Sequence, residues 1–73
     1  MLMPGQLAQQ KPFDRAFIDS MIPHHASAIE MASTALLQSD NAEIEELARS
    51  VVDALSHEIG EMIQLRQQYY PGG

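Results

Sequence analysis

The sequence contains no cysteine, which removes two ways of supporting a small fold. Disulfide bonds are excluded, and so are zinc sites built on thiolates. The chain has only 73 residues, and a domain of about this size buries only about 60% of the surface that its unfolded chain exposes. Small cores of this kind are usually supported by a disulfide, a metal or a partner subunit. A metal ion or a partner is therefore the expected support.

Basic residues are also scarce, and this excludes whole classes of function. Only four residues are Lys or Arg, against ten Asp or Glu, and the formal net charge is −6. Nucleic-acid binding needs a basic surface and a membrane-surface helix needs a basic face, so neither is expected. There is no run of about 18 apolar residues, so no transmembrane span is predicted. The first residues lack the charged start and apolar core of a signal peptide.

The sequence divides into an arm, one domain and a tail. Residues 1–12 contain Pro4, Gly5 and Pro12 and are expected to form a flexible N-terminal arm. Residues 13–70 carry two long segments with helical period, at about 14–37 and 42–69. Asp14 is expected to cap the first segment, and Asp40 or Asn41 the second. Residues 71–73 read Pro-Gly-Gly and form a C-terminal tail.

Both segments carry one apolar face when each residue advances about 100° around the helix. The face contains Phe17, Ile18, Met21, Ile22, His25, Ala28, Ile29, Ala32, Ala35 and Leu36 in the first segment, and Ile44, Leu47, Ala48, Val51, Val52, Leu55, Ile59, Met62 and Leu65 in the second. The linker is short, so the all-α fold should be an antiparallel two-helix hairpin. A lone hairpin leaves much of both apolar faces exposed to solvent. We therefore expect two hairpins to pair into a four-helix bundle, as a homodimer or higher oligomer.

Pro23 interrupts the first segment. It cannot donate a hydrogen bond to the carbonyl of Asp19, and its ring opens the turn. One interpretation is that the helix begins near Ser20, with Pro23 in its first turn. The unbroken apolar face from Phe17 to Leu36 favours a continuous helix that is kinked at Pro23.

Two adjacent histidines follow the proline. His25 falls among the apolar positions, and His24 lies at the edge of that face. Glu58 falls inside the apolar arc of the second segment, where a glutamate is rarely buried unless it is paired or binds a metal. The plainer interpretation is a buried histidine with a hydrogen-bond partner. The alternative is that histidines and carboxylate bind one cation, for which zinc, copper or iron is suited.

Three methionines lie near these residues on the predicted faces. Met21 precedes the histidines by one turn, Met31 follows His24 by two turns, and Met62 follows Glu58 by one turn. Thioether sulfur is a soft ligand that selects Cu(I) or Ag(I), although methionine on an apolar face is usually packing. The candidate metal ligands are therefore His24, His25, Met21, Met31, Glu58 and Met62.

One apparent motif is set aside. Residues 57–61 read HEIGE, which lacks the second histidine of the HExxH zinc-protease helix. His57 also falls on the polar face, away from Glu58. We interpret His57 as a solvated or interface histidine, and its role is left open.

The residues discussed above resemble the family called domain of unknown function 305. The resemblance rests on the string Phe13-Asp14-Arg15-Ala16-Phe17-Ile18, on Met21-Ile22-Pro23-His24-His25, on Ala28-Ile29-Glu30-Met31-Ala32, and on Glu58-Ile59 with Met62. It covers about residues 13–66. It departs from the family at Ala26, Ser27 and Leu55, where many members have glutamine nearby, and at His57, where many have a basic residue.

The resemblance implies a ferritin-like helical fold and a bacterial protein that is often exported or lipid-anchored, which suggests the periplasm and leaves a cytoplasmic location open. It also implies copper or silver binding, with the six candidate ligands at the matching positions. The missing glutamines suggest a weaker or differently tuned site.

Three functions follow from these observations. The favoured one is a metal-binding module, with copper held by histidine, methionine and glutamate between the helices of an oligomeric bundle. The alternative is a structural or interaction protein whose His–Glu network fixes the bundle. An enzyme is not expected, because the chain offers no recognisable nucleophile and a small bundle offers little room for a substrate.

Overall fold

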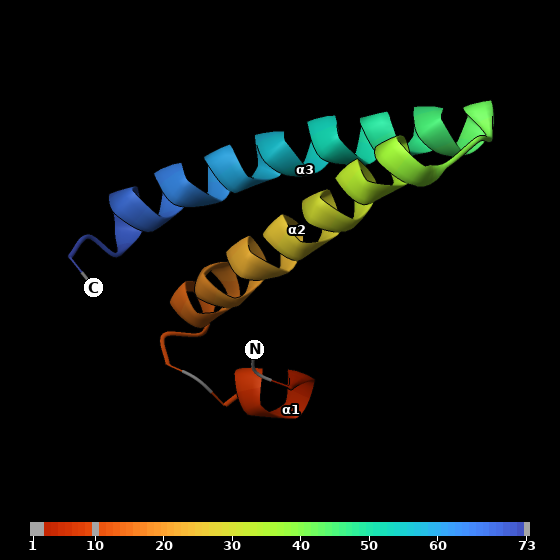
Figure 1. Cartoon of the computed structure of the whole chain (residues 1–73). Coiled ribbons are helices and arrows are strands. Elements are labelled where there is room, and N and C mark those ends of the chain that lie inside the picture. The colour runs from red at the N-terminus through yellow and green to blue at the C-terminus, as the bar shows by residue number, and fades with distance from the viewer. Residues whose placement is uncertain (1–2, 10, 73) are drawn as a thin grey trace.

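The computed structural model describes residues 3–9 and 11–72, and this part of the chain contains helices and no strand. The elements are α1 (Pro4–Leu7), α2 (Phe13–Gln38) and α3 (Ala42–Tyr69). Figure 1 shows α2 and α3 as two long helices lying beside each other, with α1 near the start of α2. The predicted all-α class is confirmed. None of the described helices is long and apolar enough to cross a membrane.

The short helix α1 was not predicted, because it lies in the stretch expected to be a flexible arm. Pro4 stands at its first position, where proline fits well because its missing N–H has no helical partner to lose. The Gln6 side chain accepts a hydrogen bond from the backbone N–H of Met3 at 3.1 Å. One turn is too short to produce a periodic apolar pattern. The arm prediction for residues 1, 2 and 10 lies outside the described residues.

Helix α2 runs without interruption through Pro23. The interpretation that a helix begins near Ser20 is therefore wrong, while the kink at Pro23 stays a prediction. Pro23 and Asp19 are both exposed, so the Asp19 carbonyl, which loses its helical partner at Pro23, can bind water. Asp14 does not cap the helix, because Pro12 occupies the cap position and Asp14 lies in the first turn. A carboxylate there still interacts favourably with the helix dipole.

The turn between the long helices ends on a well-formed cap. Asn41 Oδ1 accepts hydrogen bonds from the N–H groups of Glu43 at 2.9 Å and Ile44 at 3.2 Å. Of the two predicted caps, Asn41 is the one used. Ser39 Oγ accepts a bond from the N–H of Asn41 at 3.1 Å. The chain reverses here, and α3 runs back along α2 (Figure 1).

The core between α2 and α3 is thin. Among the described residues, the buried side chains are those of Ile18, His25, Ala32 and Ala48. Small residues let the helices approach closely near the turn. At the end of the pair away from the turn, Arg66 links α3 to α2, because its Nε donates a hydrogen bond to Asp19 Oδ1 at 2.8 Å. Assembly of such pairs into a four-helix bundle stays a prediction.

Candidate metal centre

His25 is the buried polar residue at the middle of the helix pair. Helix α2 turns it toward α3, as the wheel predicts, and only 7% of the residue is exposed. Its Nε2 lies 2.7 Å from Oε1 of Glu58 on α3. Because an ionised carboxylate only accepts hydrogen bonds, the pairing assigns the proton to Nε2. The predicted contact between the histidine and the glutamate is present in the structure.

Glu58 is less buried than the sequence predicts. Its side chain is 52% exposed, although the wheel places it inside the apolar arc of α3. The reason is that α2 covers only one side of that arc. The flank that carries Glu58 has no further helix over it, so the carboxylate reaches His25 from the rim of the interface.

The second ring nitrogen of His25 has no partner among the described residues. Nδ1 is buried and makes no hydrogen bond, and a buried polar atom without a partner costs free energy. With the proton on Nε2, a neutral ring carries its free lone pair on Nδ1. This is the arrangement of a metal-ligating histidine whose other nitrogen is oriented by a carboxylate.

A pocket of about 230 Å³ lies beside the His25–Glu58 pair. The two sulfur-bearing residues of its lining are Met21 on α2 and Met62 on α3. The complete lining is Phe17, Met21, His25, Glu58, Glu61, Met62 and Leu65. Four of the six predicted ligands therefore surround one pocket, which combines an imidazole, a carboxylate and two thioethers.

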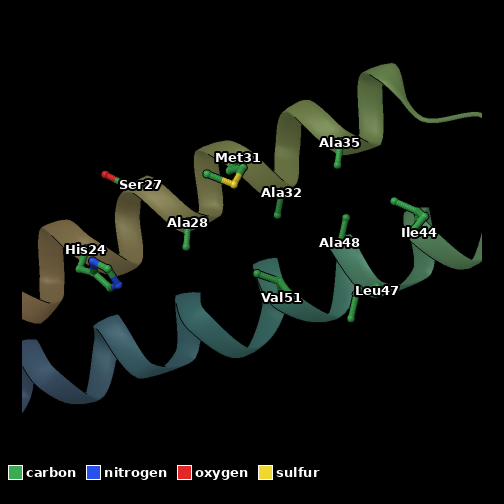
Figure 2. Close-up of a pocket in the computed structure, with 10 residues that line it drawn as sticks. All are labelled: His24, Ser27, Ala28, Met31, Ala32, Ala35, Ile44, Leu47, Ala48 and Val51. Atoms are coloured by element: carbon green, nitrogen blue, oxygen red, sulfur yellow. The ribbon is translucent and has the colours of Figure 1, made fainter.

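His24 and Met31 lie elsewhere. Both line a second, larger pocket of about 460 Å³ toward the turn. Figure 2 shows both residues on α2, where Ala28, Ala32 and Ala35 point toward α3. Adjacent residues on a helix point about 100° apart, so the fold that buries His25 leaves His24 on the exposed flank. The structure does not bring these two residues into the pocket of His25.

Two further residues clarify the site. Glu61 lines the pocket of His25, and sequence reasoning treated it only as part of the HEIGE string. Its position one turn after Glu58 was the available signal. His57 is exposed, as expected for a solvated histidine, and its Nε2 lies 3.3 Å from Oε1 of Glu61. Among the described residues, no three His, Asp or Glu side chains gather in a group that could hold a metal ion.

These features define a small helical protein with a buried, carboxylate-paired histidine beside two thioethers. The sequence profile of the family described as "Domain of unknown function (DUF305)" matches residues 3–66, and the chain belongs to this family. No curated protein matches the chain.

Two solved structures resemble the chain over nearly its whole length. They are described as "CopM in the Ag-bound form (by co-crystallization)" and "CopM in the Cu(I)-bound form". Each has 36% sequence identity and a TM-score of 0.91 over 96% of this chain. The chain spans only 51% and 50% of those two chains. The similar structures are thus those of a protein bound to silver and to Cu(I).

Proposed function

We propose that the protein binds Cu(I), with His25 as the central ligand, and that it holds the ion without catalysing a reaction. The observation that carries this proposal is the buried, unpartnered Nδ1 of His25. Glu58 holds the opposite nitrogen at 2.7 Å, which fixes the ring and leaves Nδ1 for the metal.

The donor set beside His25 favours a soft ion. Met21 and Met62 line the same pocket, and thioethers select Cu(I) over harder cations. The similarity to CopM, solved with Cu(I) and with Ag(I), supports the same choice. Zinc and iron suit histidine and carboxylate but gain little from thioethers, so they take second place.

His24 and Met31 enter this proposal as a separate pair of soft donors, one of nitrogen and one of sulfur. They share the larger pocket toward the turn. We propose that these two residues offer a second place for a soft metal ion, in addition to the His25 site. The His25 site itself would lie between the helices of an oligomeric bundle. Export from a bacterial cell would suit copper handling and stays an expectation.

The second candidate is a structural role for the His25–Glu58 pair, and the 2.7 Å contact favours it. In that case the buried polar pair fixes the register of α2 against α3. The fold would then be indifferent to metal. The two candidates differ in what happens when metal is removed and returned.

The test is a Cu(I) competition titration against a coloured chelator under reducing conditions, together with thermal melting of chelator-stripped protein. A ligand that binds only the folded state raises the Tm by mass action. We expect Cu(I) and Ag(I) to raise the Tm more than Zn(II) does. The rise should be lost in His25→Ala and reduced in Met21→Leu and Met62→Leu, which conserve side-chain volume.

Met3→Leu is the matched control, because Met3 lies outside the pocket, at the start of α1. It should leave Cu(I) affinity unchanged. If neither Cu(I) nor Ag(I) moves the melting curve, the metal proposal is wrong and the structural role takes its place.

A further inference from the structure

Glu61 connects the pocket of His25 to an exposed histidine. Its carboxylate lines that pocket, and its Oε1 lies 3.3 Å from Nε2 of His57, one turn earlier on α3. The side chain of His57 is 78% exposed and that of Glu61 is 58% exposed. Side chains four residues apart on a helix are neighbours, so a cation held between these two would lie at the rim of the pocket.

These two residues begin a series of metal-ligating side chains around α3. The series is His57, Glu61, Glu58 and Met62. When residues advance by about 100° around the helix axis, neighbours in the series are separated by about 40–60°. All four lie within about 7.5 Å along the axis at 1.5 Å per residue. Exposure falls along the series, because the Glu58 side chain is 52% exposed and that of its partner His25 only 9%. The series therefore leads from solvent toward the buried imidazole.

The pocket gives access to the buried imidazole. Nδ1 of His25 is buried and has no partner among the described residues, and His25 lines the pocket together with Glu58 and Glu61. These two glutamates supply the carboxylates of the lining. Carboxylates along a cleft attract a cation and raise its local concentration. They therefore favour the entry of a metal ion on this side of the helix pair.

The contact between His57 and Glu61 contributes little to the fold, because an exposed pair at this spacing stabilises a helix only slightly. A cation can therefore open the contact at little cost. Among the described residues, no three His, Asp or Glu side chains form a group that could hold a metal ion, so the pair binds metal weakly. Weak binding suits a place that an ion occupies only in passing, since the thioethers of Met21 and Met62 hold Cu(I) in the pocket beyond it.

We propose that His57 and Glu61 form a loading site, where Cu(I) binds first on its way into the pocket. The ion then passes to Nδ1 of His25, beside the thioethers of Met21 and Met62. This transfer exchanges one set of ligands for another and changes no oxidation state. The inference rests on the proposed function, because a loading site requires a final site. It gives a role to His57, which the metal centre itself does not use.

The test measures the rates of Cu(I) binding separately from its equilibrium, with the full 73-residue chain under reducing conditions. Release is followed as Cu(I) passes to an excess of a coloured chelator, and the rate is extrapolated to zero chelator. The loading rate constant is the release rate constant divided by the Kd from the competition titration.

We expect His57→Gln and Glu61→Gln each to slow loading by about tenfold or more. In His57→Gln, release should slow by the same factor as loading. The reason is that a group contacted only in passing lowers the barrier equally in both directions. A purely structural role for His57 would not change the two rates together.

Glu45→Gln is the matched control for Glu61→Gln. Glu45 also pairs with a residue one turn away on α3, because its Oε2 lies 3.8 Å from a guanidinium nitrogen of Arg49. Its replacement changes the net charge by the same amount, but Glu45 does not line the pocket of His25. Glu45→Gln should leave both rates near the wild-type values.

A wild-type loading rate in His57→Gln would overturn the inference. Equal slowing by Glu61→Gln and Glu45→Gln would also overturn it, because net charge alone would then explain the effect. In both cases the wild-type chain still binds Cu(I), so the proposed function stands. If the wild-type chain does not bind Cu(I), both proposals are wrong.

Discussion

Replacing Glu58 by alanine should weaken the fold and the metal site together. The substitution leaves both ring nitrogens of the buried His25 without a protein partner. A hydrogen bond to a charged group contributes about 1.5–3 kcal/mol, and the half-exposed carboxylate places this contact at the lower end. We therefore expect a loss of about 1.5 kcal/mol, or a fall in Tm of roughly 6–12 °C for a chain of this size.

The same substitution should also weaken metal binding. Loss of a group that orients a ligating histidine typically costs about 10–100-fold in metal affinity. The assays are urea unfolding of the stripped protein at one fixed concentration and the Cu(I) competition titration. Glu58→Gln keeps an oxygen that accepts from Nε2–H and should recover part of the lost stability. Glu30→Ala, at an exposed mid-helix position on α2, is the matched control and should change little.

Two outcomes would refute this reasoning. If Glu58→Ala and Glu30→Ala lose equal stability, the contact with His25 contributes nothing. If stability falls while Cu(I) affinity stays at the wild-type value, Glu58 supports the fold and His25 is not oriented for metal by it.

Three further predictions concern the framework. Asn41→Ala should cost about 1 kcal/mol by removing the acceptor that caps α3, measured by urea unfolding, and Asn41→Asp should restore most of it. Pro23→Ala should stabilise α2 by up to about 3 kcal/mol, because it restores a hydrogen bond to the carbonyl of Asp19. If a kink at Pro23 orients His25, the affinity for Cu(I) should fall in the same variant. An unchanged affinity would count against the kink. Ala48→Leu should destabilise the pair by about 1–3 kcal/mol through overpacking, and a stability equal to the wild type would show that the helices are not closely packed there.

The long helices, a cap at Asp40 or Asn41 and the burial of His25 could all be predicted, because each depends on a local pattern. Helical period gives the direction of a side chain around its own axis, and a short linker decides which way the second helix runs. The contact between His25 and Glu58 follows from these two facts.

The exposure of Glu58 and the separation of His24 from His25 could not be predicted in the same way. A helical wheel gives the direction of a side chain around its own helix axis, but it does not show which neighbouring element the side chain meets. Two helices cover only one sector of each other, so residues such as Glu58 and Met31 at the edges of the apolar arcs stay open. Met31 is 74% exposed for this reason. Placing them correctly requires the inter-helix geometry, and covering them requires a partner.

The short turn at residues 39–41 lies far from the candidate metal centre. Gln38 lies thirteen positions after His25 in α2, a distance of about 20 Å at 1.5 Å per residue. The cost of closing a loop grows slowly, by about 0.6 kcal/mol for each doubling of its length. Insertions between Ser39 and the Asn41 cap should therefore leave the distant pocket unchanged. This turn is the natural point at which an epitope, a reporter or a flexible linker could be grafted into the protein.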